Sequence, residues 1–584
     1  MGAILIMVLS FVGYIVAYRL YGEFIGKRIF QLSNANKTPS VEFEDGVDYV
    51  PTKKGIIFGH HFTSIAGTGP IVGPAIAVIW GWLPALLWIV IGSIVMGGVQ
   101  DFSALVLSMR HQGKSISEVA TEEVGNKVKI AFFLIVFIEL WLFIAILGKV
   151  MAGVFHAYPG SVFPFWIEIP IACVLGWALY KKGVPTGKGT IWAVIAMYIT
   201  VIIGELIPIT LPAIGAFDPI AVWTIILLIY AFIASVLPVT TLLQPRDYMN
   251  AWELFVAMGL MILGVFASSI GGGLHIIAPV VNSSPQGAPS LWPFLFITIA
   301  CGAISGFHSV VASGTTSKQV HYEEDALFVG YGSMLMEGAL AVLVVIACVA
   351  GLGIGARGTA PVDGITAWNG LYGAWGQVPA TTAFINGSAN MITYLGIPSG
   401  IAYVIMGVFV ASFAGTSLDT TTRLQRFVIQ ELLGSARVGG AKVQHWYTNK
   451  YGATAIALVT AALLAFSGSR TDAGLITAVG ATTLWPLFGA NNQALAALAL
   501  FTAAVYLKKR GGKKYLACYI PALFMLIMTT WALIENELSY IANGTVLLGI
   551  VNIVIIFIVL YVGITSIVSV QKKKAEEVAP KTEA

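Results

Sequence analysis

The sequence predicts an all-α polytopic membrane protein, and three observations support this fold class. Of its 584 residues, 57% are hydrophobic and only 10% are charged, whereas soluble domains carry about 25% charged residues. The mean hydropathy is +0.85. Apolar runs of about 20 residues recur along the whole chain, and each can cross a bilayer core of about 30 Å as a helix. We therefore expect about 15 transmembrane helices, some of them discontinuous.

Each expected helix covers one apolar run, and short polar loops separate neighbouring runs. The runs, in chain order, are 2–18, 56–80, 83–109, 130–155, 163–180, 190–210, 219–243, 251–273, 291–316, 326–350, 395–418, 451–468, 473–505, 515–534 and 545–568. The first run has no small-residue cleavage site after it, so we expect a retained helix and not a signal peptide. Three segments leave the count open. Segment 358–392 could re-enter or span, 473–505 could be broken, and 419–432 could extend its helix inward.

Positive charges predict the orientation of the chain. If the N-terminus lies outside, inner loops and the tail hold all but three of the 32 Lys and Arg, the exceptions being Lys149, Arg357 and Arg470. This bias is what the positive-inside rule predicts, so we expect a cytoplasmic C-terminus. The net charge of +4 is spread over short loops. Such a spread argues against a nucleic-acid partner.

The hydrophilic segments of the chain are short, and this limits the classes of function that the protein can have. The longest hydrophilic segments, 19–55 and 419–450, are too short to bury a catalytic core. The sequence contains no HExxH, P-loop or GxSxG motif, which disfavours a membrane enzyme. Four scattered cysteines without CxxC spacing read as buried apolar residues, and we expect no cofactor. A channel, or a membrane-embedded sensor that binds a small carboxylate, stays open as an alternative to a transporter.

One apolar span contains helix breakers. Segment 59–73 reads GHHFTSIAGTGPIVG, and backbone groups freed by a break find no water in hydrocarbon. In transporters, broken helices place such groups around a substrate or an ion. Segment 306–320, GFHSVVASGTTSKQV, is a weak echo that aligns His308 with His61. The two spans would run in opposite directions, as inverted repeats do, although two Gly-rich helices could also match by composition alone.

These two stretches supply the expected substrate-binding site. Its residues are His60, His61, Thr63, Ser64, Gly67, Thr68, Gly69, His308, Ser313 and Thr315. Adjacent histidines on a helix point about 100° apart, so we do not expect a metal site there. A histidine near a break could instead bind a carboxylate substrate or relay protons. Packing is the structural alternative.

Acidic residues inside spans are candidates for proton coupling. Asp101 and Glu337 each lie in the apolar span after one of the two stretches. An ionised carboxylate there costs several kcal/mol unless it is paired, so protonation becomes feasible. A structural hydrogen bond is the alternative. Asp419 is a third candidate, and its spacing from Arg423 favours an ion pair. Three adjacent amides, at positions 491–493, could line the pathway or join helices.

Four long motifs carry a resemblance to a known family. They are DGVDYVPTKKGIIFGHHFTSIAGTGPIVGP at 45–74, DFSALVLSMRHQGKSISEVA at 101–120, SLDTTTRLQRFVIQE at 417–431 and LWPLFGANNQALAA at 484–497. With these motifs the chain resembles the carbon starvation protein A (CstA) family from about residue 1 to 570. The resemblance implies a bacterial or archaeal inner-membrane secondary transporter, associated with peptide uptake during starvation and, for some members, proton-coupled pyruvate import. It also implies kinship to the amino acid–polyamine–organocation superfamily, whose core is two inverted five-helix repeats.

The resemblance also implies how the chain is divided and what it binds. Residues 1–55 would form a first helix and a cytoplasmic loop, 56–432 a transporter core, 433–570 a C-terminal bundle and 571–584 a cytoplasmic tail. Short peptides or pyruvate would be the substrate, with H⁺ as the coupling ion and Na⁺ as a possibility. Ser412 and Thr416, with carbonyls of the 58–74 break, would form a Na⁺-like site or its proton-coupled vestige. Partners would be the substrate and membrane lipids.

Overall fold

The computed structural model describes residues 2–46, 48–238, 241–271, 273–358, 364–434, 446–468, 470–479 and 481–571. Within these ranges the regular structure is helical, and the strand-like pairings are four isolated β-bridges. The expected all-α class is confirmed. The expected tail at 571–584 lies outside the described residues except for Gln571.

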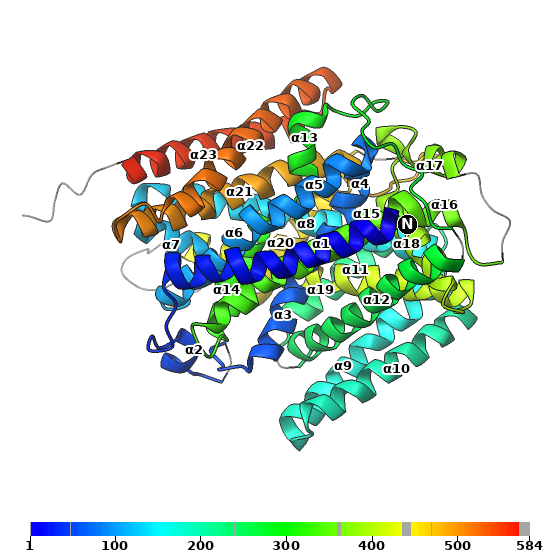
Figure 1. The fold of residues 1–584 in the computed structure, drawn as a ribbon, viewed down its shortest axis with the longest axis horizontal. Helices are drawn as coiled ribbons and strands as arrows, with labels where there is room; N and C mark the ends of the chain where they lie inside the picture. The colour runs from blue at the N-terminus through cyan, green and yellow to red at the C-terminus, as the bar shows by residue number, and fades with distance from the viewer. Residues whose placement is uncertain are drawn as a thin grey trace, which may run out of the picture.

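The chain forms a bundle of long helices with shorter ones at the loops and breaks (Figure 1). The α-helices, in chain order, are α1 (Gly2–Ala17), α2 (Pro39–Glu42), α3 (Lys54–Ala66), α4 (Gly69–Ala77), α5 (Trp82–Gly92), α6 (Gly98–Arg110), α7 (Ile116–Glu123), α8 (Lys129–Ala157), α9 (Val162–Lys182), α10 (Thr186–Leu206), α11 (Pro219–Val236), α12 (Leu243–Gly271), α13 (Leu291–Thr298), α14 (Gly306–Gly314), α15 (Ser333–Ile346), α16 (Leu352–Ile354), α17 (Gly364–Tyr372), α18 (Ala380–Thr393), α19 (Ser399–Gly434), α20 (Lys450–Ala465), α21 (Ala481–Lys509), α22 (Leu516–Asn543) and α23 (Val546–Gln571).

Twelve of the described helical segments are long and apolar enough to cross a membrane, and the bent pair of α3 and α4 makes thirteen. Two of the expected fifteen fall outside this count. The expected helix 291–316 is divided into α13 and α14, and 451–468 is α20, which has only 16 residues. The described residues also define helices in the three open segments. Segment 358–392 contains α17 and most of α18, α19 continues to Gly434, and α21 starts at Ala481. Whether 358–392 re-enters or spans stays a prediction.

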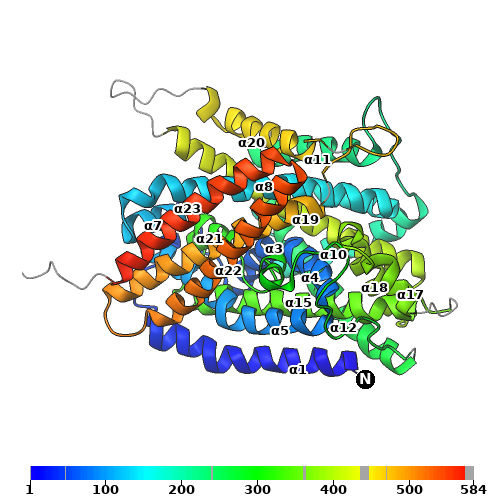
Figure 2. The same ribbon diagram turned by 90° about the horizontal axis from the view of Figure 1, so that it is seen from above.

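Burial separates a central group of helices from a peripheral one. The apolar windows of α15, α19 and α21 are 94%, 89% and 100% buried, whereas that of α1 is 22% buried. Figure 1 places α22 and α23 along one edge and α9 and α10 along the opposite edge. Seen from above, α1 lies on one side and α11 and α20 on the other (Figure 2). The outer helices expose large apolar side chains, as a lipid-facing surface requires.

Both discontinuous helices are broken at points that face each other. The first break separates α3 from α4 at Gly67, whose φ is +27°, and the second separates α13 from α14. A side chain at Gly69 would overlap Cys301, and one at Gly73 would overlap the Thr298 carbonyl. Glycine is therefore required because the first broken helix touches the second at both positions. The prediction of discontinuous helices is confirmed.

The register of the sequence echo differs from the expected one. Thr52, just before α3, pairs with Val320, just after α14. The start of α3 therefore lies beside the end of α14, so the two half-helices run in opposite directions through the same half of the protein. The echo thus aligns α3, which precedes the first break, with α14, which follows the second break. Equivalent halves of inverted repeats would follow the chain order, so the residue pairing inferred from the echo was wrong as a repeat alignment.

Side chains of α21 satisfy the backbone at the second break. Asn492 Oδ1 accepts a hydrogen bond of 2.9 Å from the Phe307 backbone N–H at the start of α14. Gln493 Nε2 donates to carbonyls within 296–300, at 3.1–3.3 Å. Trp485 Nε1 donates to the Thr298 carbonyl at 2.9 Å. Of the two roles expected for the amides at 491–493, these contacts support the joining of helices.

Replacing Asn492 with Ala should destabilise the protein by about 1–3 kcal/mol, because the buried Phe307 N–H loses its acceptor. Thermal unfolding of the purified protein in detergent measures this. Asn543→Ala is the matched control, since that exposed amide bonds only the Ser539 hydroxyl at 3.2 Å among described residues. Equal melting temperatures for Asn492→Ala and the parent protein would contradict this role.

A charged cluster joins the loop after α6 to α7 and α21. His111 Nε2 lies 2.9 Å from Glu123 Oε1, and Lys509 Nζ lies 2.9 Å from Glu123 Oε2. Burial opposes the charged form of His111, but the hydrogen bonds with Glu123 and the Leu107 carbonyl, together with the charges of Glu123 and Glu122, outweigh it and raise the pKa of His111 above its ordinary value. The folded state therefore binds the imidazole proton more tightly than the unfolded state does.

The stability gained from this raised pKa should be fully present below about pH 6.5 and should be lost as the pH rises through the folded pKa. His111→Gln should lower the free energy of unfolding by about 1 kcal/mol at low pH, since the charged hydrogen bond is lost. Melting curves of both proteins across this pH range check the sign. A difference that grows with pH would contradict it.

Candidate functional site

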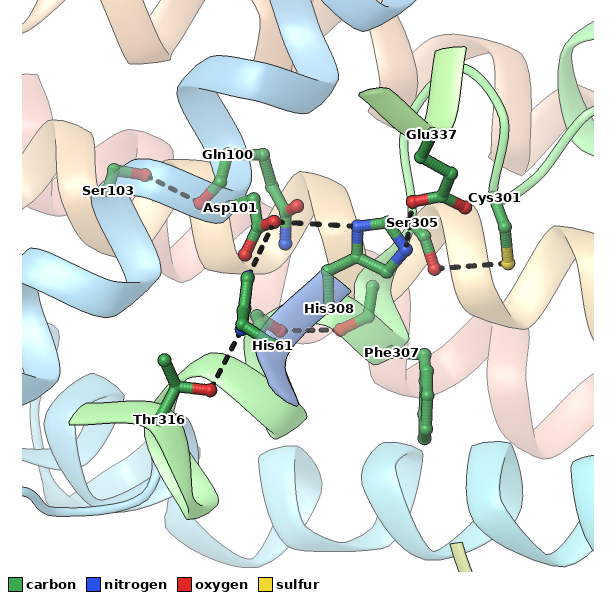
Figure 3. A network of polar contacts seen from close by, with 12 residues as sticks. His61, Gln100, Asp101, Ser103, Cys301, Ser305, Phe307, His308, Thr316 and Glu337 are labelled. Carbon is green, nitrogen blue, oxygen red and sulfur yellow. Dashed lines mark hydrogen bonds and ion pairs between the residues drawn. The ribbon is translucent and has the colours of Figure 1, made fainter. Parts of the chain in front are cut away.

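Four buried side chains form a continuous polar chain between the two broken helices (Figure 3). His61 Nε2 on α3 lies 3.1 Å from Asp101 Oδ2 on α6. The same Asp101 oxygen lies 3.8 Å from His308 Nδ1 on α14, and His308 Nε2 lies 3.2 Å from Glu337 Oε2 on α15. All four side chains have 0% exposure. One carboxylate is thus shared by the two histidines that the sequence echo had aligned.

The ends of this chain are polar as well. His61 Nδ1 lies 2.8 Å from the Thr316 hydroxyl. At the other end, Cys301, His308 and Glu337 each place one ligand atom within 4.8 Å of the others. Sulfur, imidazole and carboxylate donors could together hold Zn²⁺. The expectation that no metal is a cofactor stays a prediction.

Local irregularities in two helices bring the acids together. A π-helical turn, Ser93–Gly97, precedes α6, and another, Leu327–Gly332, precedes α15. π-turns inside helices are frequent at functional sites. A side chain at Gly330 would overlap the backbone of Phe102, so the second turn packs directly against α6 beside Asp101. This close packing holds the two helices together, and Asp101 and Glu337 lie near the two ring nitrogens of His308.

The first break carries polar atoms without partners. Among the described residues, the hydroxyls of Ser64 and Thr68 at the break are buried with no hydrogen-bond partner, and so are both amide atoms of Gln100 on α6, next to Asp101. The Ser417 hydroxyl is likewise unpartnered and lies against Gly67. Buried groups left unpaired in this way are costly, so they mark a place where a bound ligand or water would be stabilised. Thr63, by contrast, donates to the Gly59 carbonyl within α3 at 2.8 Å.

A cavity of about 450 Å³ lies between α3, α7, α12, α14 and α19, on the side where α3 begins. Three of the expected binding residues, His60, Ser313 and Thr315, line it. His60 Nδ1 lies 3.0 Å from Asp247 Oδ2. Apart from Thr63, which bonds within α3, the expected residues therefore divide into three places. His61 and His308 lie in the polar chain, Ser64, Gly67, Thr68 and Gly69 lie at the break, and His60, Ser313 and Thr315 lie in the cavity.

A second buried cluster surrounds Arg246 on α12. Arg246 Nε donates to Glu168 on α9 at 2.7 Å, and Nη1 donates to Asp419 on α19 at 2.5 Å. Tyr230 on α11 also donates to Asp419, at 2.6 Å. The predicted Asp419–Arg423 pair was therefore wrong, because Arg246 from another helix binds this carboxylate. Local i, i+4 spacing carries no information about such a partner.

The two expected ion-site hydroxyls on α19 have protein partners. Ser412 donates to Glu168 at 2.5 Å, and Thr416 accepts from Asn250 at 2.8 Å. The ion-site hypothesis stays a prediction. Sequence reasoning missed Arg246 and Glu168 as site residues. The sequence does mark Glu168 as a candidate functional residue, because it is an acid inside the apolar run VFPFWIEIPIACVLG.

The fold is that of helical membrane transporters. The crystal structure of a mutant manganese transporter from Eremococcus coleocola superposes with a TM-score of 0.51 at 11% identity, covering 90% of this chain and 98% of that one. At this identity the likeness defines the fold alone.

Sequence comparison defines the family. Residues 2–355 and 368–532 match the family described as carbon starvation protein CstA. The peptide transporter CstA of Bacillus subtilis is 33% identical, over 99% of this chain and 98% of its own length. The peptide transporter CstA of Campylobacter jejuni is 32% identical (92% and 81%), and the pyruvate/proton symporter BtsT of Escherichia coli is 33% identical (91% and 81%). The chain belongs to the carbon starvation protein CstA family, as its motifs indicated.

Replacing Arg246 with Met should destabilise the protein by about 3–5 kcal/mol, because Glu168 and Asp419 lose the cation that compensates their buried charge. The fraction of protein that remains monodisperse after heating in detergent measures this. Arg470→Met is the control, since Arg470 is exposed and donates to the Gly474 carbonyl. Similar heat resistance of the two variants would show that the cluster does not hold α9, α12 and α19 together.

Proposed function

We propose that this protein is a proton-coupled secondary transporter that imports a small carbon source, short peptides or pyruvate, across the inner membrane during nutrient limitation. The printed names of its relatives, peptide transporters and a pyruvate/proton symporter, support a transporter over a channel or a sensor. The observation that carries the proton coupling is the polar chain in which Asp101 contacts a histidine from each broken helix.

Protons would move along this chain by short transfers. Imidazole exchanges protons near neutral pH, and a carboxylate on either side can accept or return one. Asp101 and Glu337 would hold the coupling proton, and His61 and His308 would pass it between them. Asp419, the third predicted carrier, is bound by Arg246 and Tyr230, so its contacts favour a structural role.

The substrate would pass from the first break to the cavity. The unpartnered hydroxyls of Ser64 and Thr68 would bind it at the break, and the unpartnered amide of Gln100 on α6 would bind it beside Asp101. Residues of loops 48–50, 113–118 and 318–319 line the cavity, and the positive-inside rule assigns these loops to the cytoplasm. In this orientation the N-terminus is outside, the C-terminus is cytoplasmic, and the cavity is the inward exit.

Replacing Asp101 with Asn should abolish proton-driven accumulation, because an amide cannot exchange the coupling proton. Proteoliposomes given an inward proton gradient and labelled pyruvate or di- and tripeptides measure this, and we expect accumulation to fall at least about tenfold, which corresponds to about 1.4 kcal/mol. Counterflow without a gradient should persist. Asp472→Asn, at an exposed carboxylate, is the control. Undiminished accumulation by Asp101→Asn would exclude this coupling mechanism.

A further inference from the structure

Arg423 on α19 faces the cavity without a carboxylate partner. It lines the cavity beside Thr420, and its Nη1 atom is buried with no hydrogen-bond partner among the described residues. Within the described ranges, no Asp or Glu oxygen lies within 4.0 Å of its guanidinium. Asp419, four residues earlier, is bound by Arg246 at 2.5 Å. The partner suggested by the sequence spacing therefore binds Arg246 and not Arg423.

Other arginines enclosed by the same half of the protein have closer partners than Arg423 has, although Arg246 Nη2 and Arg426 Nε are also buried without a hydrogen bond. Arg246 has two carboxylates, Arg110 has Glu323 at 2.7 Å, and Arg426 donates to the Ser235 carbonyl at 2.5 Å. Arg423 has the Phe427 ring, 5.9 Å from its guanidinium carbon. A guanidinium carries five donors in a planar fork that matches a carboxylate, and leaving it half-buried without an anion is unfavourable.

Other charged groups line the cavity as well, and several of them have partners. From α3 and α12, His60 and Asp247 pair with each other at 3.0 Å. Lys114, in the loop before α7, pairs with Glu122 at 2.5 Å, and Lys318, after α14, lies over the Tyr49 ring. Three more acids line the cavity without an ion pair to Arg423, namely Asp48, Glu118 and Glu431. Among the described cations that line the cavity, Arg423 is thus the one whose guanidinium has a buried donor, Nη1, without a hydrogen-bond partner. A ligand in the cavity could supply the acceptor.

We propose that Arg423 binds the carboxylate of the transported substrate, with the Thr420 hydroxyl on the same turn of α19 beside it. The inference deepens the proposed function, because it names the chemical group that the cavity recognises. Pyruvate and the C-terminus of a short peptide both carry that group. A bidentate Arg–carboxylate contact fixes orientation as well as charge, so the site would reject analogues in which the carboxylate is replaced by a neutral amide.

Equilibrium binding to the purified full-length protein tests the inference directly. The probes are pyruvate and dialanine, each compared with its amide, pyruvamide and dialanine amide. For the parent protein we expect the amides to bind at least about tenfold more weakly than the acids, or about 1.4 kcal/mol. Arg423→Gln should weaken binding of the acids by a similar factor and leave the amides unchanged, whereas Arg423→Lys should retain part of the preference.

Arg470→Gln is the control, because it removes an exposed guanidinium that lies outside the cavity lining and donates to the Gly474 carbonyl. It should leave the preference for acids unchanged. An unaltered preference in Arg423→Gln, or no preference in the parent protein, would overturn the inference, and size-exclusion profiles exclude misfolding. Carboxylate binding through Arg423 without uptake in proteoliposomes would instead refute the proposed function alone. The acid whose binding is weakened by Arg423→Gln, pyruvate or dialanine, shows whether the recognised carboxylate belongs to a keto acid or to a peptide.

Discussion

The arrangement of the central helices depends on one carboxylate, Asp101, which lies between histidines from two different broken helices. A charged or polar group inside the bilayer needs a partner, and here the partners come from half-helices that a break has separated from the other half of the same span. Gly69 and Gly73 let the first broken helix touch the second, and amides of α21 satisfy the backbone that the second break exposes. The breaks are therefore stabilised by protein contacts that also position the polar chain.

The two buried clusters differ in a way that fits different tasks. Around Arg246, charged contacts of 2.5–2.7 Å join α9, α12 and α19, and this geometry favours a fixed framework. Along the polar chain, the contacts of Asp101 and Glu337 with the histidines are 3.1–3.8 Å. Longer contacts on short half-helices can be exchanged at lower cost. Under the proposed function, α3 and α14 would move against a framework that Arg246 holds together.

Much of the fold and part of the site could be predicted from the sequence. Apolar runs predicted the helices because length and hydropathy are local properties, and the Gly and Pro of 59–73 predicted the first break for the same reason. His61, Asp101, His308 and Glu337 were all expected at the site, since charged or imidazole side chains in apolar spans are rare. The sequence did not predict that they form one chain.

What could not be predicted depends on contacts between distant segments. Asp419 has Arg423 at helical spacing, but a residue of α12 binds it, and no local pattern reports that. The echo aligned His61 with His308 as counterparts in a repeat, but α3 precedes one break and α14 follows the other. That the two histidines share Asp101 could not be predicted from the echo. The second break itself lies at 299–305, just before the echo, where the sequence still reads as one apolar helix.

The central claim is that Asp101 holds the coupling proton. Its protonation state should therefore change when substrate binds. Infrared difference spectroscopy of the protein with and without substrate, in the parent and in Asp101→Asn, measures this directly. The account predicts a substrate-induced change in a protonated carboxyl C=O band in the parent protein that is absent from the variant, provided that the variant still binds substrate. The same carboxyl band change in both proteins would contradict it, because the coupling proton would then reside elsewhere.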